Sequence, residues 1–323
     1  MKAFVTGATG FVGAHLVRAL VARGDRVTCL VRSPAKAHAQ KWPPEVRLVP
    51  GDLDDPAALA DGCGDADVVF HLAGRISARN LAEFLAANRD GTARLVQAAA
   101  AHPPRRFVYV SSLAVGGPTV PGRPVDETRA PAPVTNYGRS KLAGEAMVRA
   151  APYPWTIVRP PVVYGEWDRE VLRVFRFAQR GWGPVIGDGT QELSVIYAGD
   201  LATALIAAAT AASTAGRVYY AAHPHLTTSR GFVEAVGRAV GRHPRIVRLP
   251  GLLAQVALGV VGSLAYVAGR ATLLSLDKAN EFLAPAWTCR ADALARDAGW
   301  RAEMDLEPGL RRTATWYRAE GWL

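Results

Sequence analysis

The segment Thr6–Gly13, TGATGFVG, constrains what this chain can fold into more than any other part of it. It follows the apolar run Lys2–Val5 and opens a stretch with helical spacing, so a strand, a tight turn and a helix are expected in that order. Its glycines let the backbone turn sharply and approach an anion closely, and the helix N-terminus offers that anion free N–H groups. The pattern predicts a binding turn for the pyrophosphate of a dinucleotide, with contacts from Gly7, Thr9, Gly10, Phe11, Val12 and Gly13.

The first half of the chain alternates short apolar runs with longer runs of helical spacing. Runs this apolar are typical of strands that are buried on both faces of a sheet. The alternation predicts an α/β protein with a Rossmann-type, doubly wound parallel sheet and right-handed crossovers. The expected strands are Lys2–Val5, Arg26–Leu30, Arg47–Val49, Val68–His71, Phe107–Ser111 and Trp155–Val158, and the expected helices are Val12–Arg23, Pro56–Gly62, Leu81–Ala101 and Tyr137–Ala150.

The pattern changes after Arg159, where prolines and glycines interrupt the apolar runs. We expect helices at Asp168–Arg180 and Gly199–Ala212, a Gly-rich turn between them, and a further strand of the main sheet at Arg217–Ala221. The remainder, from about residue 223, is expected to be mostly helical. The prediction is a dinucleotide-binding domain of residues 1–165 plus about 195–222, and a smaller, mostly helical C-terminal substrate-binding domain of about 166–194 and 223–323.

Tyr137 and Lys141 are four residues apart on an expected helix, so their side chains share one face. Lys141 can hold a nucleotide ribose and keep a positive charge beside the Tyr137 hydroxyl. That charge is expected to lower the pKa of Tyr137, which could then donate or accept a proton. Ser112 follows the apolar run Phe107–Val110 and could hydrogen-bond a substrate oxygen on which negative charge develops. A Tyr-x-x-x-Lys pair is common on solvated helix faces. We predict a catalytic role for this pair because of its position after this strand.

The chain resembles the extended short-chain dehydrogenase/reductase family, of the NAD-dependent epimerase/dehydratase type. Besides the glycine spacing, family-like segments begin at Gly51, His71, Asn88 and Arg159. The resemblance covers about the whole chain, and its C-terminal end is most similar to the 3β-hydroxysteroid dehydrogenase and dihydroflavonol-reductase-like branch. It implies that Asn88 is a fourth catalytic residue near the active site, where it orders a water or the backbone. Further cofactor contacts are expected from Asp52, Leu53, Leu72, Ala73, Gly74, Ser111, Tyr137, Lys141, Pro160, Val162 and Val163.

The same resemblance separates the two neighbouring serines. The family's catalytic serine usually lies five residues before a glycine, so Gly117 selects Ser112, and Ser111 would be structural or would face the cofactor. Related dehydratases carry Asp-Glu after this serine, whereas Leu113 and Ala114 follow it here, so dehydration by that route is not expected. Gly116 replaces a usual tyrosine, which reshapes the pocket and weakens an inference to sugar nucleotides.

The end of the second expected strand indicates which dinucleotide binds. An acidic residue there would hold the ribose 2′-hydroxyl of NAD, whereas Arg32 suits the additional 2′-phosphate of NADP. Lys36 and Ser33 could assist it. We therefore expect NADP(H) to be preferred, with NAD(H) as the alternative if Arg32 only stacks on the adenine.

The formal charge of +10 raises the question of nucleic-acid binding. The arginines lie singly along helical stretches, and the chain has no dense basic run or nucleic-acid motif, so no such partner is expected. The charge could still attract an acidic substrate or a membrane surface. Cys29, Cys63 and Cys289 are far apart, which favours a reduced, cytoplasmic compartment. No metal site is predicted, because His223 and His225 have no obvious partner and read as solvated loop side chains.

The run Gly251–Gly269 is nearly long enough to span a bilayer. It contains four glycines, Gln255 and Ser263, and no strong charge precedes it, so a transmembrane span is not expected. We expect an apolar helix or helix pair that packs in the smaller domain and could line a lipophilic pocket. Peripheral contact with a membrane surface is the less favoured alternative.

Three functions remain open at this point. The leading one is an NADP(H)-dependent ketone reductase or alcohol dehydrogenase for a small lipophilic or aromatic substrate, because the region from Leu249 to Leu276 is apolar. An NAD-dependent nucleotide-sugar epimerase and a non-enzymatic cofactor-binding protein are the alternatives. The resembled family often dimerises through the helices expected at 81–101 and 137–150, so a homodimer is expected. Loop position suggests Arg75, Ser77, Tyr164 and Trp167 as pocket residues.

Overall fold

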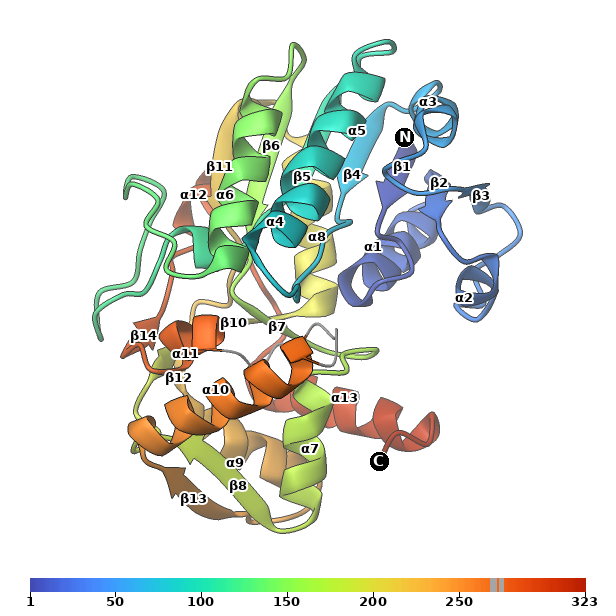
Figure 1. Cartoon of the computed structure of the whole chain (residues 1–323). Coiled ribbons are helices and arrows are strands. Elements are labelled where there is room, and N and C mark those ends of the chain that lie inside the picture. Colours follow the sequence, from blue (N-terminus) through green and yellow to red (C-terminus); the bar gives the residue numbers. More distant parts are fainter. Residues whose placement is uncertain (268–271, 273–275) are drawn as a thin grey trace.

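Seven parallel strands form one twisted sheet at the centre of the larger part of the molecule (Figure 1). The structure is a computed structural model that describes residues 1–267, 272 and 276–323. The strand order β11-β6-β5-β4-β1-β2-β3 confirms the predicted doubly wound α/β fold, and the seven expected strands are correct to within one residue at each end. The strands are β1 Lys2–Thr6, β2 Arg26–Val31, β3 Arg47–Pro50, β4 Val68–His71, β5 Arg106–Val110, β6 Trp155–Arg159 and β11 Arg217–Tyr220.

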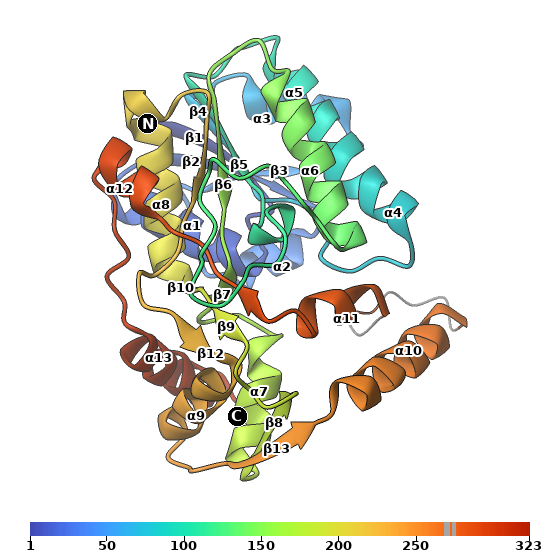
Figure 2. The same cartoon turned by 90° about the vertical axis from the view of Figure 1, so that its left-hand side faces the viewer.

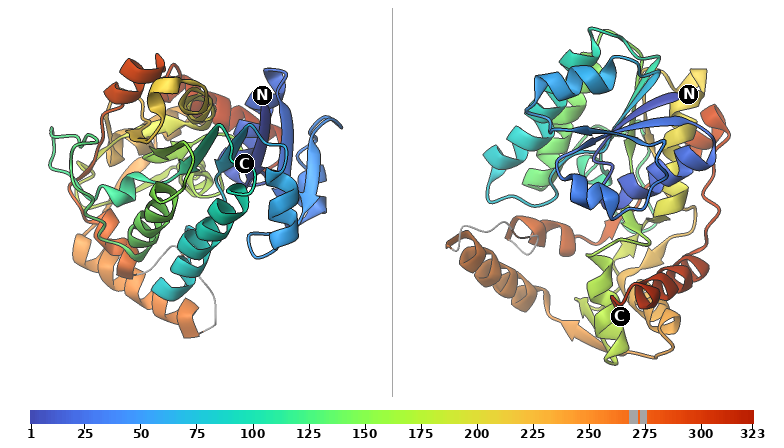
Figure 3. Two further views of the ribbon diagram at one scale, coloured as in Figure 1. Left: turned by 90° about the horizontal axis from the view of Figure 1, so that it is seen from above. Right: turned by 90° about the vertical axis from the view of Figure 1, so that its right-hand side faces the viewer.

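Helices cover both faces of this sheet (Figures 1 and 3). On one face α1 (Phe11–Ala22) and α8 (Ala198–Thr210) pack against each other, and Leu16, Phe70 and Leu205 belong to the apolar core beneath them. The opposite face carries α3 (Pro56–Cys63), α5 (Gly91–Ala99) and α6 (Asn136–Arg149), with Phe4, Leu95 and Phe107 in a second core. Apolar side chains on both faces of each strand explain why the strand runs read as continuously hydrophobic.

The helix expected over 81–101 is divided into three parts. It consists of α4 (Leu81–Leu85), a π-helical turn (Ala86–Asp90) and α5, and the wider turn changes the direction of the side chains that follow it. A short helix that the sequence reading missed, α2 (Pro34–His38), begins after β2, where the Ser33 hydroxyl accepts the Lys36 amide hydrogen bond. Ser33 thus caps the N-terminus of α2 and helps to hold the chain between β2 and α2 in one conformation.

The smaller part of the molecule surrounds a third core, to which Phe175, Val236 and Tyr317 contribute. Its main helices are α7 (Val171–Gln179), α9 (Ser229–Ala239) and α13 (Leu306–Ala319). The prediction of a Gly-rich turn after α7 is wrong in part, because this segment contains a strand, β8 (Trp182–Ile186), which pairs in parallel with β13 (Arg245–Leu249). The region after residue 223 also contains more strand than expected. The remaining short strands are β7 Val162–Tyr164, β9 Glu192–Leu193, β10 Val195–Tyr197, β12 Thr227–Thr228 and β14 Ala286–Trp287.

Three further helices follow β13. The predicted apolar helix is α10 (Gly251–Val267), which lies at the outer edge of the molecule and packs against α11 (Leu276–Phe282) (Figure 2). The last two residues of the predicted run lie outside the described part of the chain. The helix α12 (Asp292–Ala298) returns to the larger part and contacts α8 and β11. Among the described residues, no helix combines the length and apolarity that crossing a bilayer requires.

Candidate active site

The Gly-rich turn lies at the carboxyl edge of the sheet, between β1 and α1. Gly7 has a φ of +75°, and a Cβ on it would lie 2.6 Å from the Ala73 nitrogen. A Cβ on Gly13 would lie 2.2 Å from the carbonyl oxygen of Gly7. Gly10 is the N-cap of α1 and brings no capping side chain, so the first amides of the helix remain open to an anion. The turn therefore fits a dinucleotide pyrophosphate, and Thr9, Phe11 and Val12 lie partly buried around it.

The segment after β4 lies between this turn and the catalytic helix α6. The Ala73 amide donates to the Thr6 hydroxyl at 3.4 Å, and Leu72 is partly buried. Gly74 is exposed, yet a Cβ on it would lie 2.8 Å from Asn88 Oδ1 and 3.9 Å from Lys141 Nζ. Glycine at this position keeps open the approach to Lys141, as binding of a nucleotide ribose requires.

The end of β2 and the end of β3 supply the residues expected beside the adenosine. Arg32 and Lys36 are exposed, and within the described residues no hydrogen bond or ion pair engages the Arg32 side chain. Ser33 lies between them as the α2 cap. Asp52 is half-buried, and its carboxylate accepts a hydrogen bond from the Asp54 amide. Leu53 packs against Gly91, the first residue of α5. This edge thus presents two exposed cations beyond the end of β2.

The predicted catalytic side chains meet where β5 ends. Tyr137 and Lys141 occupy one face of α6, which Thr135 caps by accepting the Gly138 amide. Ser112 follows β5, and its hydroxyl accepts the amide of Ala114 at 3.1 Å. Ser112 also forms a hydrogen bond with Tyr137, which acts to lower the tyrosine pKa. The structure therefore places Ser112 beside Tyr137, and Lys141 one turn further along the same face of α6.

The pKa of Tyr137 differs from expectation. Burial raises it to about 12, against the hydrogen bond with Ser112, and the negative charge of Glu281 raises it further. Lys141 does not reverse this shift, because burial lowers the lysine's own pKa to about 7 and only the charge of Glu145 opposes that shift. Tyr137 therefore carries its proton at neutral pH, as an unshifted tyrosine does, although burial makes its hydroxyl a weaker acid.

One contact offsets part of the cost of burying the charge of Lys141. Its side chain is buried, and Nζ lies 4.1 Å from the centroid of the Tyr109 ring. A cation over an aromatic face is attracted by the ring quadrupole, which partly replaces lost hydration. A Cβ on Gly74 would lie 3.9 Å from Nζ, so the Lys141 ammonium lies next to the loop after β4.

Asn88 lies in the π-helical turn and is nearly inaccessible to solvent. Its Oδ1 accepts the Arg75 amide at 2.8 Å, and its Nδ2 donates to the Arg75 carbonyl and to the Ser140 hydroxyl. All these partners are protein groups, so Asn88 joins the loop after β4 to α6. These contacts make Asn88 a positioning residue that holds the loop after β4 against α6. Ser77, an expected pocket residue, is partly buried in the same loop.

A buried ion pair behind the catalytic residues was missed by the sequence reading. Glu145, four residues after Lys141, accepts two hydrogen bonds from Arg159 at 2.7 and 2.8 Å, and both side chains are buried. The Ser111 hydroxyl donates to the same carboxylate at 2.6 Å. Ser111 therefore has a structural partner, which was one of the two roles expected for it. The i, i+4 spacing from Lys141 was the available signal for Glu145.

A second buried network ties the turn after β1 to the π-helical turn. His71 is fully buried, its Nδ1 lies 2.7 Å from the Thr6 hydroxyl, and its Nε2 lies 2.9 Å from the Thr92 hydroxyl. Thr92 in turn donates to the Asn88 carbonyl at 2.7 Å. Burial and the charge of Lys141 lower the pKa of His71 to about 3, so the imidazole is neutral. The network fixes the distance between the phosphate turn and Asn88.

The loop after β6 contains three of the expected cofactor contacts. The carbonyl of buried Pro160 accepts the amide of Leu113, which locks the loop to the residue after Ser112. Val162 and Val163 lie on β7, with Val162 exposed and Val163 partly buried. Both valines are therefore placed beyond the carboxyl end of β6, next to the active-site edge.

Two expected pocket residues belong elsewhere. Tyr164 is fully buried and packs against Tyr197 and Phe232 in the third core. The Trp167 ring lies under the guanidinium of Arg18, 4.0 Å away. Loop position alone suggested both as pocket residues, and the fold turns them towards packed protein instead.

His223 and His225 do have a partner, contrary to the sequence reading, and His223 is buried. The Nε2 of His223 lies 3.3 Å from a carboxylate oxygen of Asp305, and Nδ1 of His225 lies 3.8 Å from it. However, Nδ1 of His223 accepts the amide of His225 at 3.2 Å. A neutral imidazole that accepts at Nδ1 carries its proton on Nε2, so this arrangement favours a hydrogen bond to Asp305 over a metal ion.

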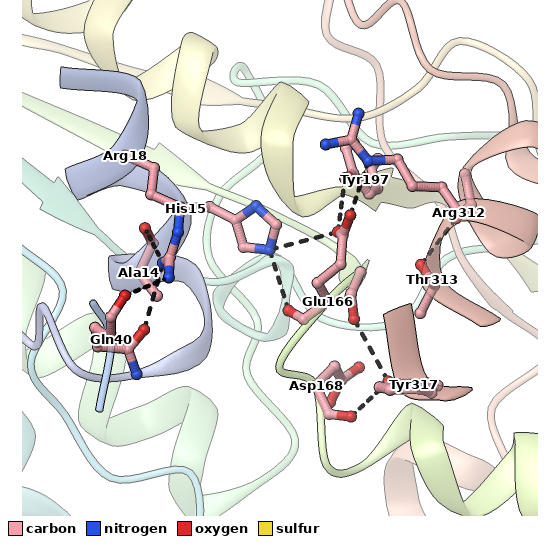
Figure 4. Close-up of polar contacts among 12 residues, drawn as sticks. Ala14, His15, Arg18, Gln40, Glu166, Asp168, Tyr197, Arg312, Thr313 and Tyr317 are labelled. Carbon is pink, nitrogen blue, oxygen red and sulfur yellow. Dashed lines mark hydrogen bonds and ion pairs between the residues drawn. The ribbon is translucent and has the colours of Figure 1, made fainter. Parts of the chain in front are cut away.

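A polar cluster joins α1 to the smaller part of the molecule (Figure 4). Buried Glu166 accepts hydrogen bonds from Tyr197 at 2.6 Å and from Arg312 at 2.8 Å, and His15 Nε2 lies 3.1 Å from its carbonyl oxygen. Burial acts to raise the pKa of Glu166, but its hydrogen bonds outweigh burial and lower it. Burial lowers the pKa of His15. The helix that carries the phosphate turn is thus fastened to α13 on the other side.

Comparison with known proteins agrees with this geometry. Residues 3–222 match the model of the NAD dependent epimerase/dehydratase family. A ceramide reductase of Caulobacter vibrioides is 36% identical over 99% of this chain and 95% of its own length. A 2-alkyl-3-oxoalkanoate reductase of Stenotrophomonas maltophilia is 28% identical over 97% of this chain and 98% of its own length.

Solved structures support the fold. The UDP-glucuronic acid 4-epimerase of Bacillus cereus, in complex with UDP-glucuronic acid and NAD, superposes with a TM-score of 0.81, at 19% identity, over 99% of this chain and all of that one. At this identity the likeness concerns the fold alone. Because the family match covers most of the chain, the chain belongs to the NAD-dependent epimerase/dehydratase family and is an NAD(P)-dependent oxidoreductase of the extended short-chain dehydrogenase/reductase type.

Proposed function

We propose that this protein is an NADP(H)-dependent reductase of a lipophilic ketone. The single observation that carries the proposal is the placement of Tyr137 and Lys141 one helical turn apart on α6, with Ser112 beside Tyr137 where β5 ends. The nicotinamide, when bound, supplies a hydride to the carbonyl carbon. Tyr137 gives its proton to the oxygen of the same carbonyl, so that one C–H bond and one O–H bond form.

The other residues of the site assist this transfer. Ser112 orients the carbonyl oxygen and stabilises the negative charge that develops on it. Lys141 holds the ribose and places its positive charge on the side where Tyr137 becomes a phenolate. Asn88, with its three hydrogen bonds to Arg75 and Ser140, keeps the loop after β4 and α6 at a fixed separation.

NADP(H) is the proposed cofactor because of the edge beyond β2. Arg32 and Lys36 are exposed there, and Arg32 has no protein partner among the described residues. A 2′-phosphate would give Arg32 a charge-assisted hydrogen bond, an interaction of roughly 1.5–3 kcal/mol. The expected effect of Arg32→Asp is a loss of NADPH affinity by about one to two orders of magnitude with little change for NADH.

The substrate class is proposed from the relatives and from the apolar smaller part. The two relatives described above are named as reductases of a ceramide and of a 2-alkyl-3-oxoalkanoate, which favours a substrate with an alkyl chain. The absence of Asp-Glu after Ser112 continues to argue against a dehydratase reaction.

The test is a steady-state assay of NADPH oxidation with ketones of increasing alkyl chain length. The proposal expects net oxidation, with kcat/KM rising as the chain lengthens. Lack of net turnover, together with conversion of a nucleoside-diphosphate sugar to its epimer, would overturn it in favour of an epimerase. Binding of NADPH with no turnover on any ketone would favour a binding protein.

We also infer a cytoplasmic homodimer. The three cysteines are free and buried, which supports a reducing compartment. The side-by-side helices α5 and α6 support a shared face for two subunits. We also propose the division into two domains that the sequence suggested, except that α12 packs against α8 and β11 of the larger part. Light scattering of the purified protein measures the subunit number, and a monomer at micromolar concentration would contradict the inference.

A further inference from the structure

The first described turns of α10 expose a row of large apolar side chains. Leu252, Leu253, Val256 and Val260 are 72%, 60%, 56% and 54% exposed. Leu252, Val256 and Val260 are spaced by four residues, so they follow one another along one side of the helix. The buried side is separate, and Ala254 belongs to it together with Leu258.

This exposed side departs from the expectation that the run packs in the protein core. Single exposed leucines are ordinary, but a continuous apolar row on a surface helix marks a contact site. The figures show α10 at the outer edge of the molecule, apart from the main sheet, with α11 as its neighbour (Figures 2 and 3). A partner outside the protein would therefore find this side accessible.

The charges around α10 indicate what kind of partner this is. No aspartate or glutamate occurs between Glu234 and Asp277, a stretch in which the chain's average would place several. Exposed arginines precede the helix instead, namely Arg242, Arg245 and Arg248. Hydrogen bonds from Thr190 chiefly lower the pKa of Asp188, and the nearby charge of Arg248 adds to this effect. Within the described residues, no ion pair is found for Arg242 or Arg245.

We propose that α10 docks the protein on an anionic membrane surface. Leucine and valine side chains would enter the boundary between headgroups and acyl chains, while Arg242 and Arg245 meet the lipid phosphates. A second copy of the same face would bring these cations towards one another, so self-association fits the charges less well. The helix lies on the membrane in this arrangement and does not cross it.

The docking helix is connected to the catalytic helix through α11. The Asp277 carboxylate accepts the Asn136 amide at 3.0 and 3.1 Å, and the Thr135 hydroxyl donates to Glu281 at 3.0 Å. Asn136 is the residue before Tyr137. Membrane contact at α10 would therefore bring the active-site edge close to the bilayer, and, if the proposed function holds, a lipophilic ketone could enter without leaving the lipid for water.

Vesicle flotation tests the docking itself, with no substrate present. The purified full chain is mixed with vesicles of phosphatidylcholine alone or of phosphatidylcholine with phosphatidylglycerol. We expect flotation with the anionic vesicles, weakening as salt is added. The double variant Leu252→Glu with Leu253→Glu is expected to lose at least tenfold in vesicle affinity, and Arg242→Gln with Arg245→Gln to lose the preference for anionic lipid. Val120→Glu is the matched control, because Val120 is 60% exposed on a separate loop.

Binding of NADPH by every variant shows that the fold is intact, and reduction of a short, water-soluble ketone should be unchanged by the α10 substitutions. Equal flotation of the wild type and the Leu252→Glu, Leu253→Glu variant would overturn the docking proposal. So would the absence of any flotation, or a wild-type dimer that this variant converts to a monomer. A protein that floats but reduces no ketone would retain the docking and refute the reductase.

Discussion

Burial favours the neutral forms of both Tyr137 and Lys141, raising the tyrosine pKa and lowering the lysine pKa. A neutral tyrosine is the required form of a proton donor, whereas a neutral lysine gives weaker support to the phenolate. Glu145 opposes the lysine shift, and its own charge is balanced by Arg159. The residues behind the site therefore influence how much charge Lys141 retains when the proton is transferred.

Removing the Tyr137 hydroxyl should affect the reaction and leave cofactor binding unchanged. We expect Tyr137→Phe to lower kcat by about 10²- to 10⁴-fold, the usual contribution of a positioned acid. NADPH titration should give the wild-type Kd. Tyr219→Phe is a matched control, because that hydroxyl is bonded to Asp297 outside the site. A Tyr137→Phe enzyme with the wild-type kcat would refute the assigned role.

The pH dependence of reduction should report Lys141. Because its pKa is about 7 in the free protein, the lysine is charged below that pH and neutral above it. We expect kcat/KM for ketone reduction to fall as pH rises through about 7, since the charge beside the forming phenolate is lost. In Lys141→Arg the guanidinium stays charged, so a lower but flatter profile is expected. The same fall in both enzymes would assign it to another group.

Local sequence predicted the residues whose partners are close in the chain or depend on backbone geometry. Gly7 and Gly13 were recognisable because only glycine fits the turn, and Tyr137 and Lys141 because four residues on a helix share a face. Arg159 and His71 were missed as site residues because their partners come from other elements. Those contacts depend on strand order and register, which apolar periodicity does not specify.

At the scale of elements, the strands were predictable and several helix details were not. The strands of the main sheet are apolar on both faces and therefore stand out in the sequence. The π-helical turn around Asn88 is not visible in residue spacing, because it adds one residue to a turn without altering composition. The strand β8 was taken for a turn because glycines surround it, and its pairing partner β13 lies about sixty residues later.

The contact between α11 and α6 provides a prediction at this scale. Asp277 accepts the Asn136 amide at the positive end of the catalytic helix, where a carboxylate is typically worth about 0.3–1 kcal/mol. Asp277→Ala should lower the free energy of unfolding by about that amount and reduce kcat/KM for a long-chain ketone. Asp188→Ala, which removes a similar carboxylate from an exposed turn, is the control. Equal effects of the two substitutions on kcat/KM would show that Asp277 does not position α6.

At the scale of the whole molecule, composition limits the possible partners of the protein but does not select one. The formal charge of +10 does not identify a partner. The exposed arginines that precede α10 are what led us to propose an anionic membrane surface. The apolar run 251–269 was best explained as core from sequence alone, because hydropathy does not say which side of a helix is covered. The structure describes that side through Val261 and shows it open.

The junction between the two parts should make stability sensitive to acid. The folded-state pKa of His15 lies below its usual 6.5 and that of Glu166 below its usual 4.5, so the unfolded chain takes up these protons first as pH falls. Stability from His15 is thus lost below about 6.5, and that from Glu166 below about 4.5. Glu166→Gln should cost roughly 1–3 kcal/mol at neutral pH and flatten the acid limb of denaturant unfolding measured against pH. An unaltered acid limb would contradict this account of the cluster.

The most direct measurement is the identity and affinity of the nucleotide. Any nucleotide carried by the purified protein is released by denaturation and identified, and fresh protein is titrated with NADPH and NADH. We expect an exchangeable site with a clear preference for NADPH that Arg32→Asp removes. Tightly held NAD that survives purification would contradict it, and would shift the proposed reaction from net reduction of a ketone to epimerisation with a retained cofactor.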